Sequence, residues 1–582
     1  MAAHNFLSEF PPVSTERWES LIRENLKGSD YASKLTWHPE EGLAVRPYYR
    51  ADDLAGLRCP DSAPGEFPFV RGTRPGGGWR IREKIDSSDP EEANRAACAA
   101  VKAGAEGIAF SGSTIKNSSD LALLLANLNE IPICLEGLGK DAARTLNERL
   151  QKRPHGAGVS ADIDPLADLD FSAELIRDRS PGFRPFVIHA DAFHERAAGA
   201  IEEVGFALSA AVDFVVEMQE RGLNVDHIAG SVSFSFAMGP EFFIQIAKLR
   251  AFRMAWAKAM ESFGETYAAG RAQIHANTAR WNETIYDAHV NILRVTTEVI
   301  SAILGGADSI SAAPFDECYR QPDESSRRLA RNTQIVLKQE ALLSRVADPL
   351  GGAYLVEALT SSIASKAWKS FQELETAGGY RKAIEADVIA SVLERRTSLR
   401  EQAAASRRRV FTGTNRFADA SERVLDRTDA ARVNSGSRAA QAFEHLRLRT
   451  ERFERRTGRQ PRIVLAEIGD PRMRSARSQF SADFLACAGL ASHKQQFESA
   501  GQIAGCDADL IVLCSADAEY PAIARELLPL LRDRGRAATV VIAGNPDSTE
   551  DLRNLGITEF IHLRSNAVEV LSRLQQQIGI GE

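Results

Sequence analysis

Two places in the sequence put reactive or ligand-binding side chains where folds of the predicted type have their sites. His194 follows a predicted barrel strand, and barrels carry catalytic acids and bases at that end of their strands. The alternative role for this imidazole is a hydrogen bond that closes the strand end. Asp470, Arg472 and Ser475 lie in a loop after another predicted strand, and doubly wound sheets bind ligands at the carboxyl ends of their strands.

The common catalytic and metal-binding signatures are absent from the sequence. There is no Gly-x-Ser-x-Gly elbow, no His-Glu-x-x-His and no clustered set of metal ligands, and the glycines at 76–78 do not form a phosphate-binding loop. The seven cysteines, at positions 59, 98, 134, 318, 487, 506 and 514, are scattered and never form Cys-x-x-Cys. This pattern indicates reduced thiols in a cytoplasmic protein and excludes a disulfide framework or a cysteine-type zinc site.

The chain has 582 residues, with 71 basic and 79 acidic side chains and a net charge of −8. An acidic balance argues against a nucleic-acid-binding protein, which usually carries a basic excess. No run of about 18 apolar residues occurs, so no membrane span is expected, and the N-terminus shows no secretory signal. The length corresponds to about three or four domains. We therefore expect a large cytoplasmic protein built from several domains.

From residue 78 onward, short apolar runs alternate with helical patterns. Eight runs are predicted as strands, at 79–83, 107–111, 132–137, 157–162, 185–190, 230–236, 272–277 and 308–313. Each leads into a helical pattern, and the longest of these cover 197–220 and 240–263. Eight strands that alternate with helices predict a (β/α)8 TIM barrel, and right-handed crossovers make the strands parallel. We place this barrel and its trailing helices at residues 71–394.

Three further segments flank the barrel. Residues 1–70 form an arm with one amphipathic helix, capped by Ser14 or Thr15, that has Trp18 and Leu21 on its apolar face. The arm is too short for a core of its own, so it either extends the barrel domain or contacts another subunit. Residues 395–460 are arginine-rich and predict a helical linker. Residues 461–582 return to strands, at 462–467, 510–514, 538–543 and 559–563, and predict a doubly wound, flavodoxin-like domain.

Several segments resemble adenosylcobalamin-dependent acyl-CoA mutases, above all the methylmalonyl-CoA mutase family. They include Pro-Gly-Glu-Phe-Pro-Phe-Val-Arg-Gly at 64–72 and Arg-Val-Ala-Asp-Pro-Leu-Gly-Gly-Ala-Tyr at 345–354, together with 244–256, 291–297, 304–309 and 331–334. The resemblance runs over nearly the whole chain. It implies a barrel that encloses the acyl-CoA and a C-terminal domain that holds the corrinoid. Such an enzyme interconverts methylmalonyl-CoA and succinyl-CoA by a radical rearrangement.

The cobalamin loop departs from the family pattern. The family carries Asp-x-His-x-x-Gly, in which the histidine ligates cobalt, the aspartate orients it and the glycine lets the corrin tail approach. Here Asp470 is retained, but Arg472 replaces the histidine and Ser475 replaces the glycine. A guanidinium has no free electron pair, so it cannot ligate cobalt. Ala543 and Gly544 stand where the family has two glycines, and the extra Cβ crowds the pocket for the nucleotide tail. The resemblance therefore implies that this chain binds no corrinoid and no metal.

The barrel also departs from the family pattern. The family's tyrosine-containing segment, which presses the substrate against the corrin, is replaced by residues 67–72 and 74–79 without tyrosine, and its Thr-x-Gln-Asn-Asp stretch has no counterpart. His194 matches a family histidine that contacts the substrate thioester. Lys248, Arg250 and Arg253 either contact CoA phosphates, as the resemblance implies, or line the polar side of an amphipathic helix.

These departures lead to the hypothesis of a non-catalytic small subunit in a heterodimeric methylmalonyl-CoA mutase. A large (alpha) subunit would hold the adenosylcobalamin and the substrate, and this chain would supply a partner surface. The sequence leaves two alternatives open. In one, the chain is itself a mutase for another acyl-CoA and binds a corrinoid without a lower histidine. In the other, it is a standalone acyl-CoA-binding or regulatory protein.

Overall fold

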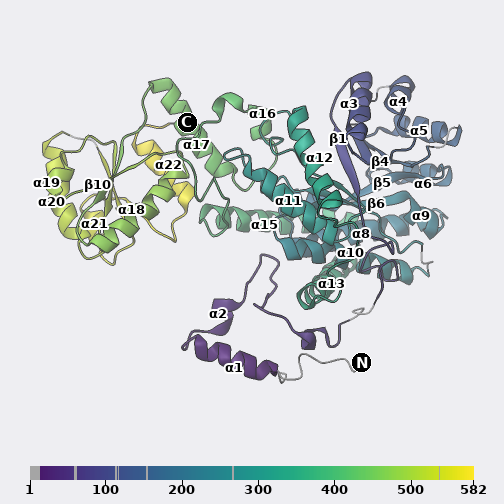
Figure 1. Cartoon of the computed structure of the whole chain (residues 1–582), viewed down its shortest axis with the longest axis horizontal. Coiled ribbons are helices and arrows are strands. Elements are labelled where there is room, and N and C mark those ends of the chain that lie inside the picture. Colours follow the sequence, from purple (N-terminus) through teal and green to yellow (C-terminus); the bar gives the residue numbers. More distant parts are fainter. Residues whose placement is uncertain are drawn as a thin grey trace, which may run out of the picture.

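Eight parallel strands close into a barrel in the computed structural model, which describes residues 13–57, 62–111, 115, 117–152, 155–264, 268–535 and 538–581 (Figure 1). Each strand pairs with the next one along the chain, and β8 closes the barrel against β1. All eight predicted strands are present, so the predicted TIM barrel is confirmed. The strands are β1 (Arg80–Ile85), β2 (Gly107–Ser111), β3 (Ile133–Glu136), β4 (Val159–Ile163), β5 (Phe183–His189), β6 (Val232–Met238), β7 (Ile274–Thr278) and β8 (Ser309–Ser311).

Helices surround the barrel, and local capping residues fix where several of them begin. The Asp89 side chain accepts hydrogen bonds from two backbone N–H groups at the start of α3, whose first residue is a proline. The helices α8 and α10 are buried on most sides because α13 packs across both of them. The barrel helices are α3 (Pro90–Lys102), α4 (Ser118–Leu124), α5 (Lys140–Lys152), α6 (Leu169–Arg177), α7 (Ala190–Glu195), α8 (Ala200–Glu220), α9 (Val225–Ser231), α10 (Phe242–Ser262), α11 (Val290–Leu304), α12 (Glu324–Gln339) and α13 (Tyr354–Thr376).

A second sheet of five parallel strands follows near the C-terminus, in the order β10-β9-β11-β12-β13. Along β11, Leu510, Val512 and Cys514 pack into one apolar cluster, while Ile511 and Leu513 pack into another. The sheet is therefore covered by helices on both faces. Its elements are β9 (Ile463–Glu467), α18 (Pro471–Ala486), β10 (His493–Gln496), α19 (Ala500–Ile503), β11 (Leu510–Cys514), α20 (Tyr520–Asp533), β12 (Thr539–Ala543), α21 (Thr549–Asn554), β13 (Glu559–Ile561) and α22 (Ala567–Gln577).

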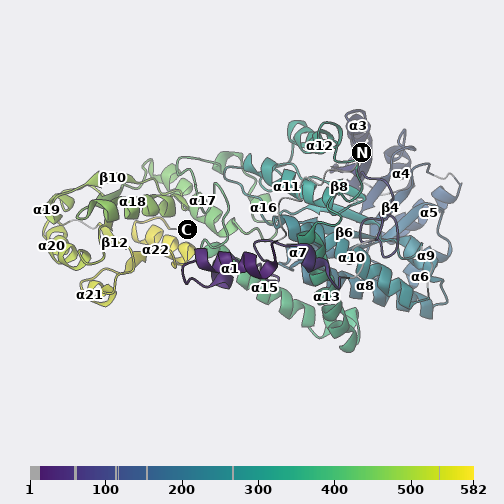
Figure 2. The ribbon, with the colours of Figure 1, turned by 60° about the horizontal axis from the view of Figure 1, so that its bottom comes forward.

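Helical segments join the two sheets, which lie at opposite ends of the molecule (Figures 1 and 2). They are α14 (Tyr380–Glu385), α15 (Val388–Ala405), η3 (Leu425–Arg427), α16 (Ala430–Val433) and α17 (Gln441–Thr457). The predicted boundary at 394/395 lies inside α15, because that helix is continuous from 388 to 405. Phe443, Leu446 and Phe453 of α17 pack into the apolar core of the C-terminal sheet. That core therefore includes residues before the predicted boundary at 461.

The N-terminal arm contains α1 (Thr15–Asn25), α2 (Tyr31–Leu35) and the short 3-10 helix η1 (Ala51–Leu54). Ser14 caps α1 through its side chain, one of the two caps predicted. No residue of α1 is buried, and Trp18 and Leu21 are 47% and 56% exposed. Figure 1 shows α1 and α2 standing apart from the barrel. Among the described residues, no helix has the length and apolar character needed to cross a membrane.

Candidate site in the barrel lumen

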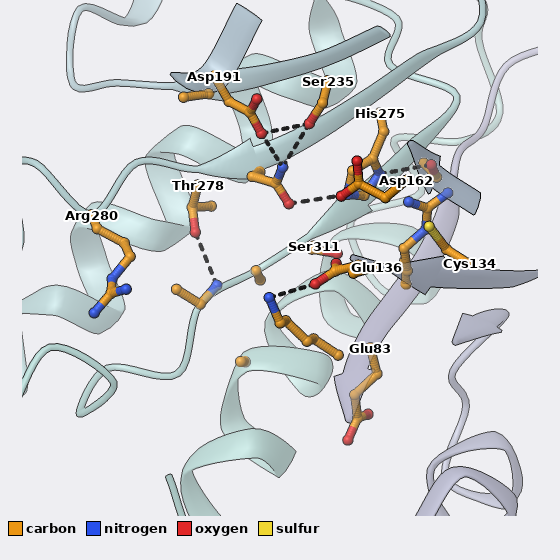
Figure 3. Close-up of a pocket in the computed structure, with 18 of the residues that line it drawn as sticks. Glu83, Cys134, Glu136, Asp162, Asp191, Ser235, His275, Thr278, Arg280 and Ser311 are labelled. Carbon is orange, nitrogen blue, oxygen red and sulfur yellow. Dashed lines mark hydrogen bonds and ion pairs between the residues drawn. The ribbon is translucent and has the colours of Figure 1, made fainter. Parts of the chain in front are cut away.

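The inner wall of the barrel is polar. Inward-facing positions of its strands line a cavity of about 520 Å³ (Figure 3). TIM barrels usually fill this space with packed branched apolar side chains. The inward-facing residues here include Arg82, Lys84, Cys134, Glu136, Ser160, Asp162, Arg184, His189, Ser233, Ser235, His275, Asn277, Ser309 and Ser311.

An ion pair crosses the wall between β1 and β3. The Lys84 Nζ atom lies 2.6 Å from Glu136 Oε2, and this carboxylate raises the pKa of Lys84 although burial opposes the shift. Lys84 nevertheless keeps 56% of its side-chain surface accessible, and Glu136 keeps 30%. A side chain inside the barrel with that much accessible surface shows that the lumen is open and not packed.

His189, at the end of β5, lies between two aspartates. Its Nε2 atom contacts Asp162, and its Nδ1 atom lies 3.0 Å from Asp191 Oδ1. Burial alone would lower the pKa of His189, but the hydrogen bonds to both carboxylates outweigh it and raise the pKa to about 11. The imidazole is therefore a cation at neutral pH, with both ring nitrogens donating.

A chain of hydrogen bonds continues from Asp191 across β6, β7 and β8. Asp191 accepts from the Ser235 hydroxyl at 2.6 Å and from the Asn277 amide at 3.0 Å. Asn277 Oδ1 can only accept, so the His275 Nε2 that lies 3.0 Å from it is the protonated ring nitrogen. His275 Nδ1 then accepts from Ser309 at 2.8 Å. Burial and the charge of Arg82 hold the pKa of His275 well below its usual range, so this ring stays neutral.

These lumen residues were not among the predicted site residues, although the sequence carries a signal for them. Parallel strands are usually apolar on both faces. The predicted strand at 230–236 instead places Ser233 and Ser235 two residues apart, and the strand at 272–277 does the same with His275 and Asn277. A period of two places such side chains on one face of a strand. Polar alternation in several strands therefore indicates a polar lumen.

His194, the predicted catalytic candidate, does not line the cavity. It lies in α7 and is 1% exposed. Its Nδ1 atom is 2.7 Å from Glu203 Oε1, and Lys248 Nζ is 2.8 Å from the other oxygen of that carboxylate. Its Nε2 atom is buried against Gly239 and has no hydrogen-bond partner among the described residues. The imidazole therefore belongs to a buried polar cluster between α7, α8 and α10.

The three predicted phosphate-binding side chains are buried as well. Lys248 is 0% exposed and pairs with Glu203. Arg250 pairs with Asp348 and lies 2.8 Å from Glu357, and Arg253 donates to the carbonyl oxygens at 305 and 306. Their charges are compensated inside the protein, and none of the three lines the barrel cavity. They tie α10 to its neighbours.

Comparison with known proteins places the chain in a family. The family model described as methylmalonyl-CoA mutase matches residues 38–117 and 164–465. The chain is 34% identical to the methylmalonyl-CoA mutase small subunit of Porphyromonas gingivalis and 31% identical to that of Streptomyces virginiae, over 98% of this chain and of each relative. It is also 31% identical to a methylmalonyl-CoA mutase of Rhizobium meliloti, over 70% of this chain and 64% of that protein. The chain belongs to the methylmalonyl-CoA mutase family.

The methylmalonyl-CoA mutase family is one of isomerases, and its members are generally cobalamin-dependent. The loop after β9 that the sequence assigns to a cobalamin site holds Asp470 as the cap of α18. Its carboxylate accepts from the Met473 backbone N–H at 2.7 Å. Arg472 and Ser475 lie exposed on the first turns of α18. Beneath the loop, the Glu519 carboxylate accepts from the Asp470 backbone N–H at 3.2 Å.

Two side chains fill the space beside Gly544, which follows β12. Arg477 Nη2 lies 2.9 Å from Asp517 Oδ1, and a Cβ placed on Gly544 would lie 2.9 Å from Arg477 and 3.0 Å from Asp517. The preceding Ala543 is fully buried within the strand. No group of three or more His, Cys, Asp or Glu side chains in the described ranges could hold a metal ion. The space beside Gly544 at this edge of the sheet is thus taken by the Arg477–Asp517 pair.

Proposed function

We propose that this chain is the non-catalytic small subunit of a heterodimeric methylmalonyl-CoA mutase. A large (alpha) subunit would hold adenosylcobalamin and the acyl-CoA and carry out the rearrangement. The observation that carries the proposal is the loop after β9, where Arg472 offers no electron pair to cobalt and the carboxylate of Asp470 caps a helix. The family's cofactor therefore does not fit the residues of this chain.

The C-terminal sheet supports the same proposal. Its strand order is that of doubly wound, flavodoxin-like folds, and we infer that it is a cobalamin-binding-type domain that no longer binds. The Arg477–Asp517 pair fills the space beside Gly544 that a nucleotide tail would need. A corrinoid would need a cobalt ligand in place of Arg472 and room beside Gly544, where the Arg477–Asp517 pair lies.

The barrel gives independent support. Its inner wall carries the Lys84–Glu136 pair and the His189–Asp162 pair, and the family-matching His194 is buried away from it. We therefore propose no catalytic role for His194. The relatives that match the whole chain are named small subunits, which is consistent with a larger partner. The absence of disulfide-type cysteine spacing in the sequence favours a cytoplasmic complex.

The experiment compares the purified single chain with a mixture of this chain and the large subunit. The purified single chain should show no corrinoid absorbance after incubation with adenosylcobalamin and no isomerase activity. A mixture with the large subunit should be active and should elute as a 1:1 complex. A single chain that retains cobalamin would overturn the proposal.

One variant and the unaltered chain address the alternative that the chain is a mutase for another acyl-CoA. Arg472→His alone should not confer corrinoid uptake, because the Arg477–Asp517 pair remains. Uptake by the unaltered chain would favour the alternative. Calorimetric titration with CoA thioesters tests the other alternative, a standalone acyl-CoA-binding protein, which requires heat of binding without the large subunit.

A further inference from the structure

A second cavity lies outside the barrel lumen, between the start of α10, the helix α11 and the segment that follows α15. Its volume of about 350 Å³ lies within the range of small-molecule sites. The N-terminal arm and the loops after β6 and β7 complete its walls. The cavity shares no lining residue with the barrel lumen, so the two are separate sites.

Apolar and aromatic side chains form much of the wall of this second cavity. Trp37, Phe243 and Val410 line it and are 46%, 43% and 45% exposed. Phe411 lines it as well and is buried. Small-molecule sites combine such apolar walls with a few polar groups that fix the orientation of the ligand. The cavity can therefore cover an apolar or aromatic ligand body.

Arg294 on α11 brings a positive charge to the same cavity. The guanidinium group donates to Thr284 Oγ1 at 2.9 Å, to Asn291 Oδ1 at 2.7 Å and to the Thr412 carbonyl oxygen at 2.9 Å. These three acceptors are neutral and occupy at most three of its five N–H groups. Arg294 forms no ion pair with any residue in the described ranges. Guanidinium groups enclosed by protein are normally paired with an anion.

The carboxyl groups whose charges reach Arg294 do not supply this anion. Burial holds the pKa of Glu283 and the pKa of Glu298 well above their usual range, so both groups stay protonated. Glu298 lines the cavity and is 1% exposed. Its Oε1 atom accepts from the Asn282 amide at 2.6 Å, and its Oε2 atom has no hydrogen-bond partner among the described residues. Asp287 is exposed to solvent and makes no described ion pair with the guanidinium group.

The other charged groups at the cavity compensate one another. Arg409 pairs with Glu241 and lies 2.7 Å from Glu40. The helix α10 begins on the cavity wall at Phe242, and no side chain caps its first turn. An uncapped helix N-terminus carries a partial positive charge and offers backbone N–H groups to a carboxylate. With Arg294, the cavity therefore holds an excess of positive charge.

We propose that this second cavity binds a small carboxylate with an aromatic or apolar body, and that Arg294 and the start of α10 hold its carboxylate group. The N–H groups that Arg294 leaves unused match a carboxylate through two parallel hydrogen bonds. The aromatic side chains of the wall cover the body of the ligand. This site goes beyond the proposed function, because it lies outside the lumen and needs neither a corrinoid nor the large subunit.

The experiment measures the binding of sodium phenylacetate to the full single chain by calorimetry and thermal shift. Two comparison probes separate the two parts of the ligand. Phenethyl alcohol keeps the aromatic body without the charge, and sodium acetate keeps the charge without the body. Phenylacetate should bind about tenfold or more tightly than either probe, because only it uses both parts of the site. No binding of phenylacetate, or equal affinity for one of the comparison probes, would overturn the proposal.

Two variants distinguish the second cavity from the barrel lumen. Arg294→Gln should weaken the affinity for phenylacetate by about tenfold or more, because a charge-assisted pair is lost. Lys84→Gln removes a cation that lines the lumen alone and should leave the affinity unchanged. Full affinity in Arg294→Gln, or loss of affinity in Lys84→Gln, contradicts the assignment.

A second pair of variants keeps the test decisive if Arg294→Gln does not fold. Thr297 is an exposed residue of α11 that lines the cavity three positions after Arg294. Thr297→Glu places a carboxylate within reach of the guanidinium group and supplies the missing anion from within the chain. This variant should fold without binding phenylacetate, whereas Thr297→Gln, of similar size and without charge, should retain binding. A Thr297→Glu variant that binds as tightly as Thr297→Gln shows that Arg294 is not the anchor.

Discussion

At the scale of single residues, His189 is a cation in the barrel lumen that two carboxylates stabilise. The imidazolium donates its Nε2–H group to Asp162 and its Nδ1–H group to Asp191, so both carboxylates stabilise its positive charge. The resulting pKa of about 11 lies far above the ordinary 6.5. The proton therefore stabilises the folded state fully below pH 6.5, and this stabilisation is lost as the pH rises through about 11.

The variant His189→Gln should remove this pH dependence. In the unaltered chain, the free energy of unfolding should fall between about pH 6.5 and 9 through this group, because the unfolded chain gives up the proton that the folded chain keeps. We expect a contribution of about 1–2 kcal/mol, since the side chain is 37% exposed to the lumen and is partly screened. Urea unfolding at both pH values measures it. His275→Gln, which removes a neutral ring, should keep the slope, and an unchanged slope in His189→Gln would contradict the assignment.

Lys248 permits a second residue-scale prediction. Lys248→Met should destabilise the fold by about 3–5 kcal/mol, because it leaves the Glu203 carboxylate buried without its cation. Adding Glu203→Gln removes that charge and keeps an acceptor for His194, so the double variant should recover most of the loss. Denaturant unfolding of the single and the double variant measures their free energies of unfolding. Equal destabilisation of the single and double variants would show that the pair is not coupled.

The surroundings of a functional residue could be predicted from the sequence only where residues adjacent in the chain determine them. The sequence shows that His194 follows a strand, but its partners Glu203 and Lys248 come from two other helices, so its burial could not be foreseen. The exposed position of Arg472 follows from its place in the first turn of α18, directly after the capping Asp470.

At the scale of elements, the strands with apolar runs were predictable and the one without was missed. The predicted runs at 510–514 and 538–543 match β11 and β12 closely. β10 reads His-Lys-Gln-Gln with all four residues exposed at the edge of the sheet. Charged and polar edge strands have no hydrophobic period, because only one neighbouring strand and little core fix them. Its pairing with β9 becomes visible only in the sheet.

Ion pairs hold the N-terminal arm against α15 and the segment that follows it. Glu40 accepts hydrogen bonds from Arg400 at 3.2 Å and from Arg409 at 2.7 Å, and the two guanidinium groups lie 4.6 and 4.4 Å from the Trp281 ring. The adjacent Glu41 is 7% exposed and one of its oxygens lacks a partner among the described residues. Burial, with repulsion from Glu241, raises the pKa of Glu41 to about 7.

This junction should therefore loosen as the pH rises. The folded-state pKa of Glu41 lies above the ordinary 4.5, so its contribution is full below pH 4.5 and is lost as the pH rises through about 7. Hydrogen exchange of residues 37–50 should be faster at about pH 8.5 than at about pH 6. Glu41→Gln should make the exchange independent of pH over this range. Glu40→Gln, which removes the negative charge of both arginine ion pairs, should loosen the segment at either pH, and a pH effect that persists in Glu41→Gln would refute the role of this carboxyl.

At the scale of the whole molecule, the first helix of the arm lies outside the apolar core, whereas Leu43 and Val45 further along the arm pack into the barrel core. α1 buries none of its residues, and its contacts are local, such as the edge-on packing of Trp18 and Tyr48 at 5.8 Å and the 2.8 Å hydrogen bond from Thr15 to Asp52. An amphipathic helix with an exposed apolar face normally covers that face with a partner. In the proposed heterodimer, that partner is the large subunit.

The double variant Trp18→Ser/Leu21→Ser should separate assembly from folding. Both side chains are about half exposed, so their loss should leave the Tm of the single chain within about 2 °C, as expected for surface changes of about 0.5 kcal/mol. Complex formation with the large subunit should nevertheless weaken by about tenfold or more, because two large apolar side chains then no longer leave water on binding. Analytical ultracentrifugation of the mixture measures both species. Glu24→Gln, on the exposed polar side of the same helix, should assemble normally. If the double variant assembles as tightly as Glu24→Gln, the arm does not contribute to the interface.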